Sequence, residues 1–516
     1  MKRAGSNSSP KQAPKQQAIS NFFALESSKS VPTRLKQLAF KTSGSVYYYQ
    51  SPSFTPHPLP SFPQTVNSSH PNFKLAAFDF DDTLARVNGT HTFPKTPSDY
   101  RIFHESVFSV LYALARSGFA LVIFSNQKGI LDKQNGDHRR VVFEGRVSRF
   151  VAGFEDYCIC KSTAAKDGAE GIGLLVAAAT SDDFYRKPRP GLMGWYMHKF
   201  ALGQFVPSSS SRLDSALTNP CSADIFYCGD AAGRLSSHAR KRDHSKSDMD
   251  FAFNCRTKFF YPETLFNDQN HQQLLELESD SKNGAIFELP AADFDFGEKA
   301  GVQTPLPLVA ASVPAVAHPT TPANPNSSKL IAEIDFSRFD VIVLVGSPAS
   351  GKSTFVRNVI NNTPDDCTHA VISQDTLKTA ARCITQAKQQ LANGGRIVID
   401  NTNPTRKARS AYLALHGRKL CVWIQTDKQT CIHNNSFRKI GNHVRDCLQI
   451  WMAAEDLGVE DSEPVPRVAI DSFWSKFEPP SLQEGFDELV HVVFEGQFEH
   501  NALRWIYNMV LESNFY

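Results

Sequence analysis

The sequence predicts an α/β protein with two parallel-sheet domains that follow a disordered, basic tail. Two apolar runs, Leu75–Phe78 and Val341–Val345, each lead into a polar motif and then into a helical stretch. Further short apolar runs alternate with helical stretches in both halves of the chain. Two segments with few periodic apolar residues, 1–70 and 291–334, separate these halves from the N-terminus and from each other. Short apolar strands that alternate with helices are typical of parallel sheets.

The length of 516 residues suits about two to four domains of roughly 150 residues each. Residues 1–70 contain eight basic residues and one acidic residue and are rich in Ser, Pro, Gln and Asn. We expect this tail to be disordered, because it cannot bury enough apolar surface to offset its ordering entropy. The proline-rich segment 291–334 is predicted to be a linker. The two domains are then residues 71–290 and 335–516.

Composition excludes several classes of protein. No apolar run approaches the roughly 20 residues that span a bilayer, and the N-terminal region lacks the apolar core of a secretory signal. The ten cysteines include no C-x-x-C pair, so neither a zinc site nor a disulfide scaffold is expected. The net charge of +3 argues neither for nor against a nucleic-acid partner. We therefore expect an intracellular protein with reduced thiols.

The first candidate site begins with Asp79-Phe-Asp81-Asp-Thr83, directly after the run Leu75–Phe78. A D-x-D turn brings two carboxylates together, so that one can attack a phosphorus atom while the other carries a proton for the leaving oxygen. Acidic turns are common at strand ends, so this motif alone also fits a structural role. Support for a catalytic role has to come from elsewhere in the domain.

Further polar groups follow the apolar runs Leu121–Phe124 and Ile225–Cys228. They are the hydroxyl of Ser125, the cation of Lys187, and the carboxylates of Asp230, Asp248 and Asp250. In parallel sheets ligands bind beyond the carboxyl ends of the strands, and Mg²⁺ prefers oxygen ligands. These elements, in this order, resemble the haloacid-dehalogenase phosphatase superfamily.

That resemblance implies a role for each residue. Asp79 would be the nucleophile that forms an aspartyl-phosphate, and Asp81 would be the acid/base. Ser125 and Lys187 would bind the phosphoryl group. Mg²⁺ would be held by Asp79, by Asp230 and by the carbonyl of Asp81. The residue after Asp81 is Asp82, where the superfamily usually has glycine, and we expect its extra charge to slow phosphate entry.

The second candidate site is a phosphate-binding loop. Its sequence matches G-x-x-x-x-G-K-[ST] in full and consists of Gly346, Ser347, Pro348, Ala349, Ser350, Gly351, Lys352, Ser353 and Thr354. In such loops backbone N–H groups surround the phosphates of ATP, the lysine reaches the β/γ oxygens, and the hydroxyl after it ligates Mg²⁺. The loop lies between a predicted strand and a predicted helix, as this interpretation requires.

Residues around the loop suggest a kinase. Asp375 follows the run Ala370–Ile372 and could take a proton from an acceptor hydroxyl. Asp400 ends the run Ile397–Ile399 and is expected to be a further Mg²⁺ ligand. Arg438 lies in a predicted helix and would cover the phosphates as part of a lid, although a solvated helix charge is the alternative.

The two sites in this order resemble the eukaryotic polynucleotide kinase 3′-phosphatase family, over about Leu75 to Phe486. Stretches outside the catalytic motifs contribute to the resemblance: Phe93-Pro-Lys-Thr-Pro-Ser-Asp99, Phe124-Ser-Asn-Gln127, Gly229-Asp-Ala-Ala-Gly-Arg234, His433-Asn-Asn435 and Phe477-Glu-Pro-Pro-Ser-Leu-Gln-Glu-Gly-Phe486. The family implies removal of 3′-phosphate and ATP-dependent phosphorylation of 5′-hydroxyl termini, in DNA strand-break repair in the nucleus. Asp375 would then be the base and Arg438 the lid arginine.

The chain departs from animal members of this family at three places. Gln374 and Ser436 stand where those members have arginine, so contacts with the DNA acceptor are expected to differ, and Lys378 is a candidate replacement. A tail of 70 residues is also too short for the forkhead-associated domain that recruits the animal enzymes. It contains instead Gln16-Gln-Ala-Ile19-Ser-Asn-Phe22-Phe23, which matches the sliding-clamp-binding box Q-x-x-[ILM]-x-x-F-F. A helical turn would place Ile19, Phe22 and Phe23 in an apolar pocket beside a hydrogen bond from Gln16.

Two other functions fit part of the sequence. One is an RNA-end healing kinase-phosphatase, against which the lack of a ligase or cyclic-phosphodiesterase segment counts. The other is a clamp-bound or DNA-bound scaffold with decayed catalysis. The complete phosphate-binding loop and the intact pair Asp79 and Asp81 argue against decay.

Overall fold

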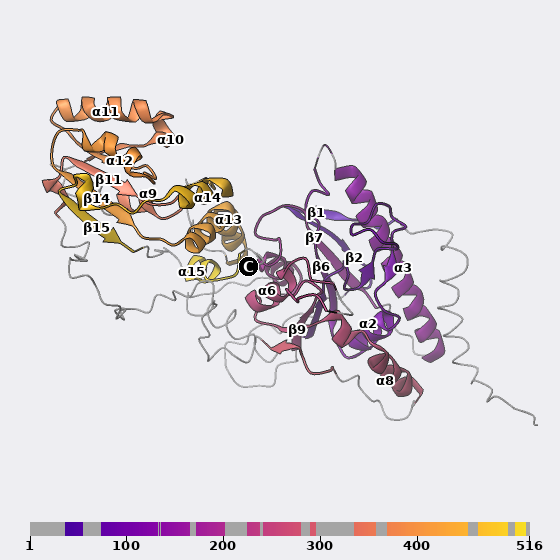
Figure 1. Cartoon of the computed structure of the whole chain (residues 1–516). Coiled ribbons are helices and arrows are strands. Elements are labelled where there is room, and N and C mark those ends of the chain that lie inside the picture. Colours follow the sequence, from indigo (N-terminus) through magenta and orange to yellow (C-terminus); the bar gives the residue numbers. More distant parts are fainter. Residues whose placement is uncertain are drawn as a thin grey trace, which may run out of the picture. The chain divides into compact units, whose positions relative to one another are not determined.

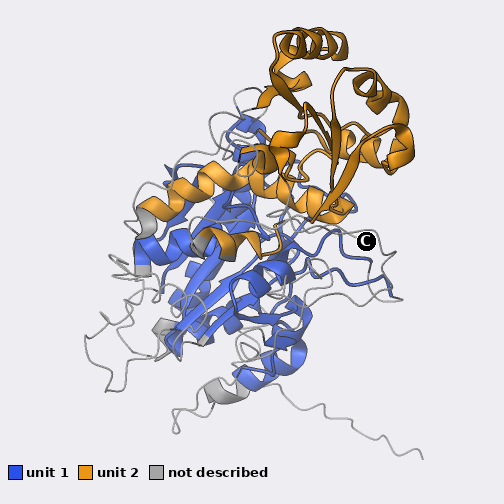
Figure 2. Cartoon of the chain, turned by 90° about the vertical axis from the view of Figure 1, so that its left-hand side faces the viewer, with its two compact units in different colours: residues 1–205, 211–300, 513–516 blue, residues 206–210, 301–512 orange. Residues whose placement is uncertain are grey.

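The computed structural model describes residues 37–54, 74–132, 134, 136–165, 172–201, 224–237, 241–279, 289–295, 335–357, 369–452, 463–493 and 501–511. These residues form two compact units (Figure 2). The first unit holds the described residues up to 295, and the second holds those from 335 onward.

The first unit is built on an eight-stranded sheet with the strand order β1-β2-β7-β6-β3-β8-β9-β10. Its five central strands are parallel, namely β7 (Leu174–Ala179), β6 (Ala120–Asn126), β3 (Lys74–Phe78), β8 (Asp224–Cys228) and β9 (Lys258–Phe260). The three apolar runs predicted as strands in this part of the chain are all strands of this sheet. Every residue of β7 is buried, as expected for a strand covered on both faces.

The predicted parallel sheet is confirmed at its centre and is extended at both edges by antiparallel strands. β1 (Lys41–Ser43) and β2 (Val46–Gln50) form a hairpin that pairs with β7, and β10 (Phe294–Asp295) pairs with β9. Residues 41–50 therefore do not belong to a disordered tail, and the predicted linker begins too early. Gly44 in the turn has a φ of 58°, a conformation that glycine adopts without a steric penalty.

Helices cover both faces of the sheet (Figure 1). On one face lie α2 (Val107–Arg116), α3 (Gly136–Ala165) and α8 (Asp268–Ser279), which contribute to one apolar core with the strands. On the other face α4 (Gly191–Tyr196), the π-helix η1 (Met197–Ala201) and α6 (Ser247–Asn254) pack through aromatic contacts to β2, β6 and β8. Three short elements complete the unit: β4 (Ala85–Arg86), β5 (Arg101–Ile102) and α7 (Pro262–Leu265).

The second unit is built on a five-stranded, fully parallel sheet in the order β12-β13-β11-β14-β15. The strands are β11 (Val341–Val345), β12 (His369–Ile372), β13 (Arg396–Ile399), β14 (Lys419–Ile424) and β15 (Glu488–Val492). The three apolar runs predicted as strands in this part of the chain are again strands. The central strand β11 is completely buried and leads directly into the phosphate-binding loop.

Helices lie on both faces of this sheet as well. α11 (Ala380–Ala392) and α12 (Arg406–Leu413) pack on one face, and η3 (Phe336–Arg338) and α9 (Lys352–Phe355) pack on the other. The remaining elements are α10 (Gln374–Leu377), α13 (Lys428–Met452), α14 (Arg467–Lys476), η6 (Leu482–Glu484) and α15 (Asn501–Tyr507). The carboxyl ends of β11, β12 and β13 lead into the phosphate-binding loop, Asp375 and Asp400, and the helix α13 that carries Arg438 follows β14.

Among the described helices, none combines the length and apolarity needed to cross a membrane. The cysteines in the described part of the chain are all free thiols. The predicted clamp-binding box at residues 16–23 lies outside the described residues.

Candidate active sites

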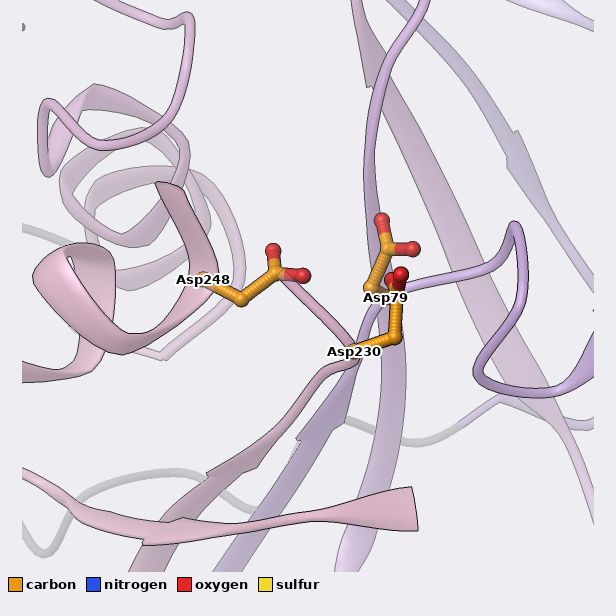
Figure 3. Close-up of side chains that lie close together, drawn as sticks. All are labelled: Asp79, Asp230 and Asp248. Atoms are coloured by element: carbon orange, nitrogen blue, oxygen red, sulfur yellow. The ribbon is translucent and has the colours of Figure 1, made fainter. Parts of the chain in front are cut away.

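Three aspartates from separate segments converge at the carboxyl edge of the first sheet (Figure 3). Asp79 follows β3, Asp230 follows β8, and Asp248 lies in the first turn of α6. One carboxylate oxygen from each lies within 4.8 Å of the other two. The close approach of α6 requires Gly229, because a Cβ at that position would lie 2.5 Å from the Cβ of Asp248. Oxygen donors gathered in this way fit a divalent cation.

Lys187 lies among these carboxylates and is 3% exposed. Its Nζ donates to Asp79 Oδ1 at 2.6 Å, to Asp248 Oδ1 at 2.8 Å and to the Tyr227 hydroxyl at 2.7 Å. Burial raises the pKa of Asp79 to about 8, although the charge of Lys187 opposes this rise. Lys187 and a bound cation would therefore both favour the ionised form of Asp79, which is the form that attacks phosphorus.

Asp81 lies outside the three-aspartate cluster and is held by two other side chains. Gln127 Nε2 donates to Asp81 Oδ2 at 2.8 Å, and Arg146, which is 1% exposed, donates to Asp81 Oδ1. The same Gln127 nitrogen donates to Ser125 Oγ at 2.9 Å. Because the Ser125 oxygen accepts this hydrogen bond, its own hydrogen is available to a phosphate oxygen. Gln127 thus connects the predicted acid/base with the predicted phosphate-binding hydroxyl.

Three further aspartates of the first site differ in their positions and contacts. The sequence offered Asp248 and Asp250 as further metal ligands, and the structure places Asp248 in the aspartate cluster. Asp250, the other one, pairs with Lys246 at 3.3 Å. Asp82 adopts a φ of 56°, the left-handed conformation that glycine provides elsewhere, at a cost on the order of 1 kcal/mol. The turn therefore forms with aspartate at this position.

The phosphate-binding loop of the second unit encloses Lys352. Its Nζ donates to the carbonyl oxygens of Gly346 at 3.1 Å and Ser347 at 2.8 Å. Burial lowers the pKa of Lys352 to about 8, and the nearby positive charge of Arg438 contributes to this lowering. Two cations from the loop and from α13 therefore act on the same region, where the negative charge of a triphosphate would stabilise both.

The two predicted metal ligands of the kinase meet beside this loop. Ser353 Oγ, in the first turn of α9, donates to Asp400 Oδ2, at the end of β13, at 2.8 Å. A hydroxyl and a carboxylate oxygen at this distance, next to a triphosphate site, fit a divalent cation that keeps several other oxygen ligands.

The predicted base Asp375 is exposed in the first turn of α10. Its turn is fixed by Ser373 Oγ, which accepts from the Asp375 N–H at 3.1 Å, and by Asn401 Oδ1, which accepts from the Gln374 N–H at 2.7 Å. Lys378 is exposed, and its Nζ donates to the Asp375 carbonyl at 2.6 Å, so a cation does stand beside the base. Ser436, in contrast, is buried and donates to the Ile432 carbonyl inside α13.

Residues 74–266 match the family described as polynucleotide kinase 3 phosphatase, and residues 341–445 match the AAA domain family. The chain is 27% identical over 427 residues to the bifunctional polynucleotide phosphatase/kinase of Schizosaccharomyces pombe, covering 82% of this chain and 80% of that protein. It is 30% identical over 193 residues to the polynucleotide 3′-phosphatase ZDP of Arabidopsis thaliana, covering 37% of this chain and 24% of that protein.

A third relative is the polynucleotide 3′-phosphatase of Saccharomyces cerevisiae. It is 23% identical over 235 residues, which are 40% of this chain and 93% of that protein. Both candidate sites lie entirely within the two regions that match the family models. The family matches thus cover the aspartate cluster in one unit and the phosphate-binding loop in the other.

Proposed function

We propose that this chain, which belongs to the bifunctional polynucleotide phosphatase/kinase family, restores the ends of DNA strand breaks in the nucleus. Its two activities are those of a polynucleotide 3′-phosphatase and a polynucleotide kinase, which use a divalent cation and ATP. The proposal adds DNA as the polynucleotide and Mg²⁺ as the cation. The proposal is supported by the presence, in one chain, of the aspartate cluster with Lys187 and of the phosphate-binding loop with Lys352 and Asp400. A break with a 3′-phosphate and a 5′-hydroxyl needs both reactions before a ligase can join it.

In the phosphatase reaction, the Asp79 carboxylate attacks the phosphorus atom and the bond to the 3′ oxygen breaks. Asp81 donates a proton to that oxygen and later takes one from the water that hydrolyses the aspartyl-phosphate. Lys187 orients Asp79 and, together with the Ser125 hydroxyl, binds the phosphoryl group. A cation held by Asp79, Asp230 and Asp248 would offset the repulsion between these carboxylates and the incoming phosphate.

In the kinase reaction, Asp375 takes the proton from the 5′-hydroxyl as its oxygen attacks the γ-phosphorus of ATP. Lys352 and Arg438 stabilise the charge on the transferring phosphoryl group. Ser353 and Asp400 would hold the cation that accompanies ATP. The exposed cation Lys378, next to Asp375, is placed to contact a backbone phosphate of the acceptor strand.

A single substrate set tests the proposed function. A nicked DNA duplex with 3′-phosphate and 5′-hydroxyl ends, and its RNA equivalent, are incubated with Mg²⁺ in the presence and absence of ATP. We expect phosphate release from the DNA in both cases and 5′-phosphorylation only with ATP. Faster processing of the RNA would favour the RNA-end healing function instead. The absence of both activities would favour a scaffold.

The acid/base role of Asp81 predicts a defect that depends on the leaving group. Asp81→Asn keeps the backbone carbonyl and an oxygen for Arg146 but cannot donate a proton to an alkoxide. We expect a loss on the order of 10²- to 10⁴-fold for a 3′-phosphate on deoxyribose. An aryl phosphate should be affected much less, because a phenolate leaves without a proton. Steady-state rates on both substrates measure the difference, and equal losses would indicate a structural role for Asp81.

The proposal also includes recruitment by a sliding clamp through the tail. A peptide spanning Lys11–Leu25 should bind the clamp with roughly micromolar affinity, as expected for a short segment that is ordered on binding. The double change Phe22→Ala and Phe23→Ala should abolish binding, because both apolar anchors are lost. Calorimetry of wild-type and mutant peptides against purified clamp measures this.

The control changes the basic residues of the same peptide. Lys11→Ala and Lys15→Ala should weaken clamp binding only at low salt, because distant surface charges mainly steer association. If the aromatic change has no effect and the lysine changes abolish binding, the tail is a simple cationic segment. The clamp interpretation would then be wrong.

A further inference from the structure

Side chains of neighbouring segments hold the carbonyl groups of the phosphate-binding loop. Asn434 Nδ2, on α13, donates to the Ala349 carbonyl at 2.9 Å, and Thr426 Oγ1 donates to the Ser350 carbonyl at 2.7 Å. Ala349 has a φ of 61°, in the left-handed region that a residue with a Cβ occupies only where its surroundings stabilise it. The hydrogen bond from Asn434 therefore supports an unfavourable backbone conformation in the middle of the loop.

Asn434 is oriented in turn by the last described helix of the chain. The Tyr507 hydroxyl, at the end of α15, donates to Asn434 Oδ1 at 2.5 Å. Burial raises the pKa of Tyr507, so this hydroxyl remains a donor throughout the neutral range. If the amide were reversed, Asn434 Oδ1 would face the Ala349 carbonyl, and two acceptors would repel each other. Tyr507 thus selects the amide orientation that the loop requires.

Several contacts fix α15 against α13 within the second unit. His433 Nε2 donates to the Tyr507 carbonyl at 2.5 Å, and the Tyr507 ring packs edge-on against His433, at 4.7 Å between centroids, and Phe437, at 5.4 Å. Leu503 and Ile506 on the same helix are buried. Figure 1 shows α15 beside α13. The Tyr507 hydroxyl is therefore held in place from several directions.

We propose that Tyr507 is a positioning residue for ATP, which acts through Asn434 on the conformation of Ala349. The proposal rests on the kinase function of the second unit. It assigns to α15 an effect on nucleotide affinity rather than on phosphoryl transfer, because the Tyr507 hydroxyl acts on Asn434, and Asn434 holds a backbone carbonyl of the phosphate-binding loop.

The variant Tyr507→Phe tests the proposal, because it removes the hydroxyl and keeps the ring. Calorimetry with a non-hydrolysable ATP analogue and Mg²⁺ should give an affinity about three- to tenfold lower than that of the wild type, as expected for one lost hydrogen bond. The KM for ATP in the kinase assay should rise by the same factor, while kcat stays near the wild-type value. Unchanged affinity for the analogue would overturn the proposal.

A double-mutant cycle tests whether Tyr507 acts through Asn434. Asn434→Ala should weaken analogue binding at least as much as Tyr507→Phe, and the double variant should bind no more weakly than Asn434→Ala alone. Additive losses would mean that Tyr507 acts by another route, and the proposal would be wrong. Arg504→Ala, on the exposed side of α15, is the matched control and should bind the analogue like the wild type.

Two further measurements distinguish a failure of the positioning role of Tyr507 from a failure of the kinase function on which it rests. The 3′-phosphatase activity should be unchanged in Tyr507→Phe, and the melting temperature should fall by a few degrees at most, which shows that the chain is folded. A wild-type chain that binds the analogue but transfers no phosphate to 5′-hydroxyl ends would refute the kinase function. An active wild type with an unaffected Tyr507→Phe variant would refute only the positioning role.

Discussion

Asp79→Asn should lower the rate of 3′-phosphate release by about 10⁴-fold or more, because the substitution removes the nucleophile while the rest of the site is retained. The 5′-kinase activity of the same chain should stay near the wild-type value, since the kinase residues belong to a different compact unit. A duplex with a 3′-phosphate at one nick and a 5′-hydroxyl at another allows both rates to be measured in one reaction with ATP and Mg²⁺.

Asparagine is preferred to alanine at this position because of Lys187. The amide oxygen can still accept from Lys187 Nζ, which also keeps its contacts with Asp248 and Tyr227. Because burial disfavours the charged form of Asp79 and Lys187 keeps its ion pair with Asp248, the melting temperature without added divalent cation should stay near the wild-type value. Asp156→Asn, on the exposed surface of α3, is the matched control and should retain both activities. Loss of kinase activity in a folded Asp79→Asn chain would contradict independent units.

The sequence was sufficient to locate the strands and the motifs that follow them. The runs Leu75–Phe78 and Val341–Val345 are buried strands because uninterrupted apolar residues of this length fit the centre of a sheet covered on both faces. The residues directly after such strands are then fixed at the edge where ligands bind. Asp79, Ser353 and Asp400 could be placed in this way, because their position depends mainly on local order along the chain.

Contacts between distant segments could not be predicted in the same way. Gln127 and Arg146 hold Asp81 across 46 and 65 residues of sequence, and nothing in their local patterns indicates this partner. Asp248 reaches the aspartate cluster only because Gly229 lets α6 approach β8. These relationships depend on how helices and strands pack together, which periodicity and motif spacing do not specify.

The hairpin of β1 and β2 shows a different kind of error. Its strands lie in residues 1–70, whose overall composition is typical of disorder. The composition of the whole segment does not reveal the short β-forming run Val46–Gln50 that follows Gly44. The run is buried because it covers one edge of the parallel sheet through β7. The pairing of β2 with β7 therefore determines the structure of this segment, which its composition alone does not predict.

Lys352→Ala should have the converse effect to Asp79→Asn. The 5′-kinase rate should fall by about 10²- to 10³-fold, because the substitution removes a preorganised positive charge from the transferring phosphoryl group. The 3′-phosphatase rate should be unchanged, with or without ATP. Single-turnover measurements of phosphate transfer to a 5′-hydroxyl oligonucleotide, at saturating ATP, would separate this loss from weaker nucleotide binding.

A second substitution distinguishes the loss of charge from the loss of volume at this buried position. Lys352→Met keeps most of the side chain's length but cannot donate to the carbonyl oxygens of Gly346 and Ser347. If the charge is what matters, methionine and alanine should reduce the kinase rate to a similar extent, whereas Lys388→Ala, on the exposed side of α11, should have no effect. Burial disfavours the charged form of Lys352, so removal of this charge should not destabilise the unit electrostatically. The melting temperature of the methionine variant should therefore be close to that of the wild type. Substantial kinase activity in a folded Lys352→Met chain would show that the loop binds phosphate through its backbone alone.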